Sequence, residues 1–314
     1  MYIYKAFGLI IESDFAIRQM LPYSGEENLP AAQPDLRITS GPTPSSLVAA
    51  PIIDIPTLKV SRTAMWMEIP EIGRFYTANG AEARVERLFA PSEDKESELQ
   101  VYLTGSCMGA ILHERGLVPL HGSCIEQNGR GLLLTGVSGA GKSTLSAEAL
   151  RNGWKMLSDD ITPVFLKDGN VWAEPSFPQQ KLWDDAIVRS GNEARAERRI
   201  YDFEDRTKYA VDVRDSFSKK TAVLSAVVQL IPKEEEWDGR PFIEPVQGIE
   251  RAILLREHTY RTYLLADVAD KQEHFRKCAV FAGRLKMAHI FRYRGVSEET
   301  LWAGAEKWFN EAEN

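Results

Sequence analysis

The sequence predicts a mixed α/β fold, with a small β-rich module at the N-terminus and a larger α/β core after it. Short strand patterns broken by proline, glycine and asparagine fill the first part of the chain, and such spacing is typical of β structure. A helical pattern follows, and strands and helices then alternate to the C-terminus, which indicates an α/β or α+β core. We therefore expect the module at residues 1–92, a bridging helix at 93–116 and the core at 117–314.

The module and the helix are predicted from local patterns. Ala78-Asn79-Gly80 marks a turn between strands. From Glu96 to Arg115, apolar residues recur at helical spacing, and Gly116 ends the pattern. We expect strands over Tyr2–Ile11, Leu36–Thr39, Leu58–Val60, Met65–Ile69 and Gly73–Tyr76.

Residues 136–143, GVSGAGKS, have the complete pattern of a phosphate-binding loop. The apolar run Arg130–Thr135 predicts a buried strand before the loop, and a helix begins near Ser143. The glycines let successive N–H groups turn inward, and the positive end of the helix reinforces this nest. The alternative is a glycine-rich turn that binds nothing, but the strand and helix on either side favour a nucleotide.

Two side chains of the loop carry specific chemistry. Lys142 can reach the β and γ phosphates of ATP, and the Ser143 hydroxyl can hold Mg²⁺. We predict that the nucleotide is bound by Gly136, Val137, Ser138, Gly139, Ala140, Gly141, Lys142, Ser143 and Thr144.

Two carboxylates follow the next predicted strand, Trp154–Ser158, at Asp159 and Asp160. Ligands of open α/β sheets bind at the carboxyl ends of strands, so a strand next to the loop would bring both acids to the phosphates. One could hold Mg²⁺ and the other could accept the proton of an attacking hydroxyl. The alternative is that one caps the following turn and the other is solvated.

His121 lies in the apolar stretch Pro119–Ile125, which precedes the hairpin turn Asn128-Gly129 into the loop strand. The histidine belongs at the end of its strand away from that turn, and its register decides whether it stands near the loop. A lone histidine in an apolar strand is more often a core residue than a catalyst, so both interpretations stay open.

Together these elements resemble the catalytic core of the HPr kinase/phosphorylase family, which shares its nucleotide-binding architecture with ATP-dependent phosphoenolpyruvate carboxykinase. His121 stands 21 residues before Lys142, and the acidic pair stands 17 and 18 residues after it. The resemblance implies a Mg-ATP-dependent kinase that phosphorylates a serine. It also implies that Asp159 is the base, that Asp160 and Ser143 are the magnesium ligands, and that His121 is an accessory catalytic group beside Lys142.

The resemblance covers residues 117–183 and departs from the bifunctional enzymes after the acidic pair. Their Glu-Ile-Arg-Gly stretch is missing, and Glu174–Trp183 stands in its place, as in the shorter HPr-kinase-related proteins that include kinases of lasso peptide precursors. The resemblance therefore implies a serine of a ribosomal, lasso-type peptide precursor as the acceptor. The alternatives are an HPr-type carrier protein as the substrate and a nucleotide-sensing module that transfers no phosphoryl group. Lys181 either replaces the family's arginine as a phosphate contact or is an ordinary surface lysine.

Composition excludes several classes of protein. The chain has 314 residues, 44% of them hydrophobic, which suffices for a core. A net charge of −7 without a block of basic residues argues against a nucleic-acid partner. We find neither a signal peptide nor a membrane span and expect a cytoplasmic protein. The partner would be a peptide or small protein, and oligomerisation is left open. We expect Cys107, Cys124 and Cys278 to be reduced residues of the core.

The second half of the core continues the alternation. We expect a hairpin from Ile161–Phe165 and Asn170–Ala173, a strand over Val223–Leu230, a helix over Asp270–Met287, a strand over His289–Arg294 and a closing helix over Glu298–Glu313. Phosphoryl transfer usually needs further positive charge, and the sequence does not choose among its candidates. These are Arg261, Arg292 and Arg294, whereas His258, His274 and His289 lack metal-ligand spacing and are interpreted as structural.

Overall fold

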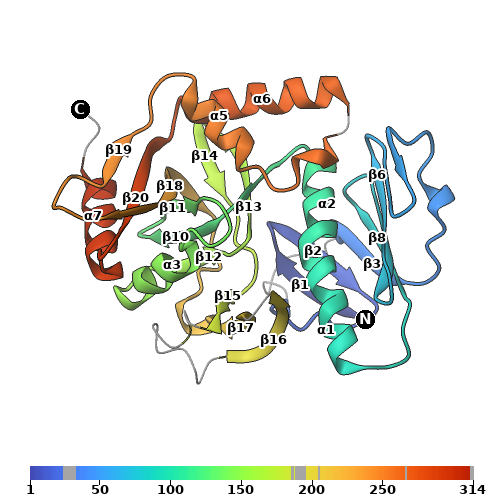
Figure 1. Cartoon of the computed structure of the whole chain (residues 1–314). Coiled ribbons are helices and arrows are strands. Elements are labelled where there is room, and N and C mark those ends of the chain that lie inside the picture. The colour runs from blue at the N-terminus through green and yellow to red at the C-terminus, as the bar shows by residue number, and fades with distance from the viewer. Residues whose placement is uncertain (24–32, 185–186, 188–195, 204–205, 266, 312–314) are drawn as a thin grey trace. The chain divides into compact units, whose positions relative to one another are not determined.

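A computed structural model of the chain describes all residues except 24–32, 185–186, 188–195, 204–205, 266 and 312–314. The chain divides into two compact units (Figure 1). The first contains Met1–Pro119 and Tyr260–His274, and the second contains Leu120–Thr259 and Phe275–Asn314. Both units combine strands and helices, so the predicted mixed α/β class is confirmed.

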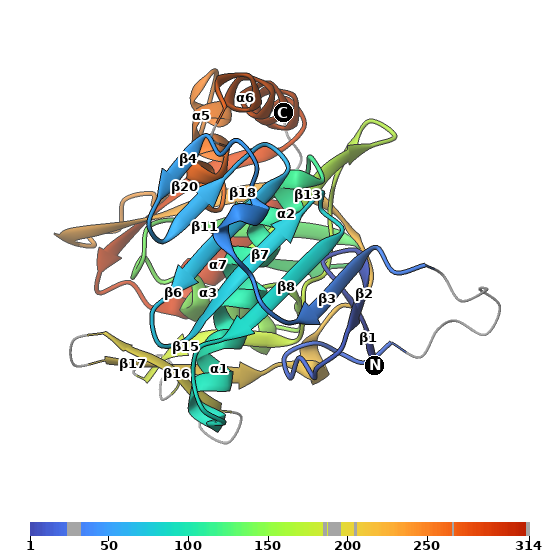
Figure 2. The same ribbon diagram turned by 90° about the vertical axis from the view of Figure 1, so that its right-hand side faces the viewer.

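The first unit contains an eight-stranded sheet in the order β1-β2-β3-β8-β7-β6-β5-β4 (Figure 2). The predicted turn at Asn79-Gly80 joins β7 to β8, and both of its residues have positive φ. Its strands are β1 (Tyr2–Ala6), β2 (Leu9–Ser13), β3 (Leu36–Ser40), β4 (Ile53–Ile55), β5 (Leu58–Val60), β6 (Ala64–Ile69), β7 (Gly73–Ala78) and β8 (Glu82–Arg87).

One long helical segment packs on this sheet. It consists of α1 (Glu93–Tyr102), a π-helical stretch (Leu103–Cys107) and α2 (Met108–Glu114). The Ser92 hydroxyl caps its first turn by accepting from the Lys95 N–H. The ring of Tyr260, which the chain contributes from far downstream, packs over Gly105 and Gly109; a Cβ on Gly109 would lie 2.8 Å from that ring.

The second unit is built on a mixed sheet. Its order is β12-β10-β11-β18-β14-β13-β9, and β20 pairs with β18 and with β19. The β11, β18 and β20 strands are parallel, and the hairpin neighbours are antiparallel. The strands are β9 (Val118–His121), β10 (Ser123–Gln127), β11 (Arg130–Thr135), β12 (Lys155–Ser158), β13 (Ile161–Lys167), β14 (Asn170–Ala173), β18 (Ala222–Glu236), β19 (Ile243–Pro245) and β20 (Lys286–Arg294).

Helices and a small three-stranded sheet complete this unit. The small sheet has the order β15-β17-β16, and α3 packs against α7 and β15. Trp154 lies at the centre of this packing, 1% exposed, with the rings of Trp302 and Phe309 at 5.2 and 5.1 Å. The elements are α3 (Lys142–Arg151), α5 (Glu250–Glu257), the part of α6 (Val268–Ala282) that begins at Phe275, α7 (Glu298–Asn310), β15 (Gln179–Trp183), β16 (Ala196–Phe203) and β17 (Arg206–Asp212).

Several predicted boundaries were wrong. The single strand expected over Tyr2–Ile11 is a hairpin, because Phe7 and Gly8 both take positive φ and turn the chain. The stretch Pro119–Ile125 breaks at Gly122 into β9 and β10. The helix expected to reach Met287 ends at Ala282, and β20 begins at Lys286. Strands β4, β8, β15, β16, β17 and β19 were not predicted.

The lengths of the helices and the state of the cysteines bear on the expectations from composition. Within the described ranges, every helix is too short or too polar to cross a bilayer. All three cysteines are buried free thiols, as predicted.

Candidate functional site

The glycine loop joins β11 to α3, as the sequence predicts. Gly136, Gly139 and Gly141 all have positive φ, so the loop uses backbone conformations that other residues adopt only with strain. At Gly136 space is limiting as well, because a Cβ would lie 2.6 Å from the carbonyl oxygen of Leu230 in β18. The neighbouring parallel strand therefore fixes where the loop leaves the sheet.

Lys142 is the first residue of α3 and folds back over the loop. Its Nζ donates to the carbonyl oxygens of Gly136 at 2.9 Å and Val137 at 3.1 Å. The next residue, Ser143, is tied to the small sheet through its backbone, since Gln180 Nε2 donates to its carbonyl oxygen at 3.0 Å. The lysine and the hydroxyl predicted to contact the phosphates and the metal thus stand at the start of a helix that is anchored on two sides.

The acidic pair lies at the same edge of the sheet as the loop, but not on the adjacent strand. Strand β10 pairs antiparallel with both β11 and β12, so β12 runs in the direction of β11 with β10 between them. The expectation that the neighbouring strand carries the pair was wrong, because the Asn128-Gly129 hairpin inserts β10. The double reversal of direction still brings the carboxyl ends of β11 and β12 to one edge.

The two aspartates have different surroundings. Asp159 is 7% exposed, and both of its oxygens accept hydrogen bonds, one from the Ser123 hydroxyl and the other from the Lys181 backbone N–H at 2.8 Å. Asp160 has positive φ, and its side chain is 26% exposed. Its Oδ2 accepts from Lys181 Nζ at 2.6 Å. The first carboxylate is therefore held within the protein, whereas the second borders solvent.

His121 stands beside this second carboxylate. Its Nδ1 lies 3.5 Å from Asp160 Oδ1, and the Thr135 hydroxyl at the end of β11 donates to its carbonyl oxygen at 2.7 Å. Burial lowers the pKa of His121 below its ordinary value, while the charge of Asp160 acts in the opposite direction. The register that the sequence left open places His121 at the edge where the glycine loop begins.

Lys181 connects both acids. Its side chain is 13% exposed and pairs with Asp160, while its backbone N–H binds Asp159. The interpretation as an ordinary surface lysine was wrong, because β15 carries this residue into the acidic pair.

A row of polar residues next to the loop escaped the sequence analysis. Thr135, Gln229 and His289 are register neighbours on β11, β18 and β20. Gln229 Nε2 lies 2.9 Å from Nε2 of His258, and burial lowers the pKa of His258 to about 4. His258 and His289 were read as structural because they lack metal spacing. For His289 the signal that could have found it is the polar residue that interrupts each of β11, β18 and β20 at the same level; His258 follows α5 and carries no such signal.

The structure separates the three candidate arginines. Arg261 belongs to the first unit, where its Nη1 donates to the Tyr263 hydroxyl at 2.8 Å. Arg294 pairs with Glu234, and both side chains are exposed. Arg292 donates through Nη1 to the carbonyl oxygen of Ala140 at 3.4 Å, so it contacts the glycine loop.

The side-chain oxygens predicted to bind magnesium suit an ion that a nucleotide also binds better than an ion held by protein side chains alone. Among the described residues, no group of three or more histidine, cysteine, aspartate or glutamate side chains could hold an ion. Mg²⁺ at nucleotide sites needs only one or two protein oxygens, because phosphates and water supply the rest. The Ser143 hydroxyl and a carboxylate of the acidic pair are of this type.

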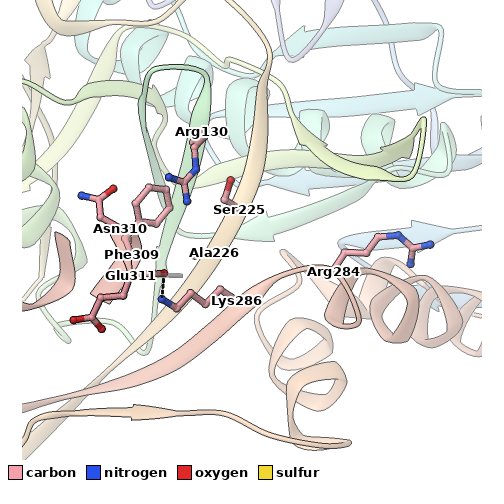
Figure 3. A pocket seen from close by; sticks show the side chains of 8 residues that line it. All are labelled: Arg130, Ser225, Ala226, Arg284, Lys286, Phe309, Asn310 and Glu311. Atoms are coloured by element: carbon pink, nitrogen blue, oxygen red, sulfur yellow. Dashed lines mark hydrogen bonds between the residues drawn. The ribbon is translucent and has the colours of Figure 1, made fainter. Parts of the chain in front are cut away.

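A separate cavity of about 420 Å³ lies at the opposite ends of β11, β18 and β20 (Figure 3). The Arg130 guanidinium stacks 4.5 Å from the centre of the Phe309 ring. Lys286 Nζ donates to the carbonyl oxygens of Trp308 and Glu311, and Arg284 donates to the carbonyl oxygen of Gly169. These cations anchor the end of α7 and a hairpin, so they contribute to the fold.

Comparison with known proteins identifies relatives of this chain. The family described as SynChlorMet cassette protein ScmC matches residues 91–200. The HPr kinase/phosphorylase of Streptococcus thermophilus is 34% identical over 108 residues, which are 32% of this chain and 34% of that protein. The enzyme of the same name from Streptococcus agalactiae is 32% identical over 124 residues, 39% of this chain and 36% of that protein. The chain therefore spans about a third of the curated relatives it matches.

The HPr(Ser) kinase/phosphatase of Coxiella burnetii superposes with a TM-score of 0.30 at 12% identity, covering 60% of this chain and 91% of that chain. A superposition this loose adds nothing to the sequence relationship. The fold and the site define an α/β protein built around a strand, a glycine loop and a helix. By its sequence, the chain is related to the HPr kinase/phosphorylases, which confirms the predicted resemblance to that family.

Proposed function

We propose that this protein is a Mg-ATP-dependent kinase that transfers the γ-phosphoryl group to a serine hydroxyl of a peptide or small protein. The observation that carries the proposal is the meeting of three elements at one sheet edge. The glycine loop follows β11, the acidic pair follows β12, and His121 at the end of β9 lies 3.5 Å from Asp160. Phosphoryl transfer needs this combination of a phosphate cradle, a positive charge and a carboxylate.

The loop amides and Lys142 would hold the phosphates and offset the charge that develops on them. Magnesium, held by the Ser143 hydroxyl together with phosphate oxygens and water, would supply further positive charge. The sequence-based assignment adds Asp160 to the metal ligands and makes Asp159 the base, and it stays a prediction.

We propose instead that Asp160, and not Asp159, is the base. An acceptor hydroxyl must reach the carboxylate that takes its proton. Asp159 is 7% exposed and already accepts from Ser123 and Lys181, whereas the side chain of Asp160 is 26% exposed. Asp160 would therefore accept the proton, and Asp159 would position Lys181. Burial shifts the pKa of His121 downward and so favours its neutral form, in which it can form a hydrogen bond with Asp160 or the acceptor.

For the acceptor we propose a ribosomal peptide precursor of the lasso type. This rests on the Glu174–Trp183 stretch that replaces the bifunctional enzymes' motif. The names of the curated relatives, HPr kinase/phosphorylase, favour a second candidate, a carrier protein of the HPr type. A module that binds nucleotide without transfer is the third.

The test is incubation of the purified protein with γ-labelled ATP and Mg²⁺ in three parallel reactions: with a precursor peptide, with HPr, and alone. Label on the peptide supports the first candidate, and label on HPr supports the second. Nucleotide binding without label or hydrolysis in any reaction supports the third and overturns the kinase proposal. A Lys142→Ala variant is the matched control, because it should lose nucleotide affinity along with any transfer.

A further inference from the structure

We propose that Arg292 and Glu298 form a brace that positions the glycine loop from its outer side, so that the loop binds ATP more tightly when this pair is intact. The inference rests on the proposed function, because it concerns how the same site holds its nucleotide.

The brace comes from elements distant in sequence from the loop. Arg292 lies near the end of β20, and Glu298 lies in the first turn of α7, which is capped by Ser297. One Nη of the arginine pairs with Glu298 Oε1, and the other donates to the carbonyl oxygen of Ala140 at 3.4 Å. The two side chains are 21% and 18% exposed, so solvent screens their attraction less than that of a surface pair.

The contact with Ala140 sets the direction of a peptide group. In a trans peptide the C=O and the following N–H point in opposite directions. A guanidinium that attracts the Ala140 carbonyl outward therefore directs the Gly141 N–H to the other side. Gly141 immediately precedes α3, where unpaired N–H groups and the helix dipole favour an anion. Arg292 would thus act through the backbone and not by touching the phosphate.

Gly141 shows how closely the arginine approaches. Its φ is 93°, and the guanidinium of Arg292 occupies the place where a Cβ at position 141 would stand. The glycine is therefore needed twice, once for its backbone conformation and once to admit Arg292. If Arg292 served only to stabilise β20, its guanidinium would not need to lie against the loop.

Burial of the Glu298 carboxylate lowers the stability of the fold, and the ion pair with Arg292 offsets this loss. Its Oε2 is buried without a hydrogen-bond partner among the described residues, and its Oε1 pairs with Arg292. Removing the arginine alone leaves a buried carboxylate unpaired, which destabilises a protein strongly. Stability and positioning must therefore be separated by experiment.

The experiment measures MgATP affinity by calorimetry and unfolding by urea for wild type, Arg292→Met, Arg292→Lys and Arg292→Met/Glu298→Gln. Arg294→Met is the control, since Arg294 lies two residues further along the same strand in an exposed pair. We expect Arg292→Met to lose stability and to bind ATP about tenfold more weakly, the size of a lost charged hydrogen bond. Arg292→Lys should regain part of the affinity, because it keeps the charge.

The double variant separates the effect of the pair on ATP binding from its effect on stability. It removes both charges, so it should regain stability and yet bind ATP about tenfold more weakly than wild type. Saturating ATP should restore its turnover, because only binding is affected. If the double variant binds ATP as wild type does, the pair is merely structural and the inference is wrong. If wild type itself fails to bind ATP, the proposed function fails instead, which the Arg292 variants alone could not show.

Discussion

Replacing Asp160 by asparagine tests the assignment of the base. The substitution keeps the shape of the side chain, and asparagine tolerates the positive φ of 72° at this position. It removes the negative charge that pairs with Lys181 Nζ at 2.6 Å and faces His121 Nδ1 at 3.5 Å. If Asp160 accepts the proton, transfer should slow by about 10²–10⁴-fold, the usual contribution of a general base.

The matched substitution at Asp159 should give a different result. Both oxygens of this buried carboxylate accept hydrogen bonds, from the Ser123 hydroxyl and the Lys181 N–H. An asparagine offers one oxygen and one NH₂ group, so one donor loses its acceptor, at a cost of about 1–3 kcal/mol in unfolding free energy. Asp160→Asn keeps an oxygen that can accept from Lys181 Nζ, but it removes the charge opposite a lysine whose side chain is 13% exposed, so it should also lose some stability.

The assay combines single-turnover transfer from labelled ATP with urea unfolding and ATP titration. The expected pattern is a large loss of transfer in Asp160→Asn while the variant remains folded, and a stability loss with residual transfer in Asp159→Asn. Both variants should still bind ATP, because the loop is untouched. Normal transfer by Asp160→Asn together with none by a folded Asp159→Asn would refute our reasoning and return the role of base to Asp159.

Three further predictions concern the loop, the core and pH. Gly136→Ala should abolish measurable ATP binding, because its Cβ would lie 2.6 Å from the Leu230 carbonyl, while Gly283→Ala, at a position without positive φ and with no neighbouring atom closer than 3.6 Å to its Cβ, is the control in the same titration. Trp154→Ala should lower the unfolding free energy by about 3–5 kcal/mol in urea melts, and a loss below about 1 kcal/mol would contradict the packing seen around its ring. Burial raises the pKa of Glu114 to about 7. Between about pH 4.5 and pH 7, the folded state therefore holds a proton that the unfolded state has released. The stability that this carboxyl contributes is fully present below about pH 4.5 and is lost as the pH rises through about 7. Urea unfolding at pH 5 and pH 8 should therefore show a smaller difference in Glu114→Gln than in wild type, and equal differences would exclude this carboxyl as the source.

Local features of the site could be predicted from the sequence, and its long-range pairings could not. The strand, loop and helix around Lys142 depend on neighbouring residues, so their order is visible in the chain. The position of β12 depends on a hairpin that inserts β10 between it and β11, which no local pattern specifies. For the same reason the sequence could not choose among three arginines, since only the parallel pairing of β20 with β18 brings Arg292 to the loop.

Turn chemistry explains other differences. Asn128-Gly129 and Asp168-Gly169 are standard turn pairs, and the hairpins they predict are present. Phe7-Gly8 is a turn of the same kind, but a phenylalanine with positive φ is uncommon, so the chain was expected to continue as one strand.

The first unit is discontinuous in the chain, and this limits how the protein can be divided. The segment Tyr260–His274 belongs with Met1–Pro119, and it supplies the Tyr260 ring that covers Gly105 and Gly109. A gene fragment that stops at residue 119 would encode every strand of the eight-stranded sheet and still leave those two glycines bare on its helix. Anyone who wishes to study this unit alone should therefore append the downstream segment through a designed linker.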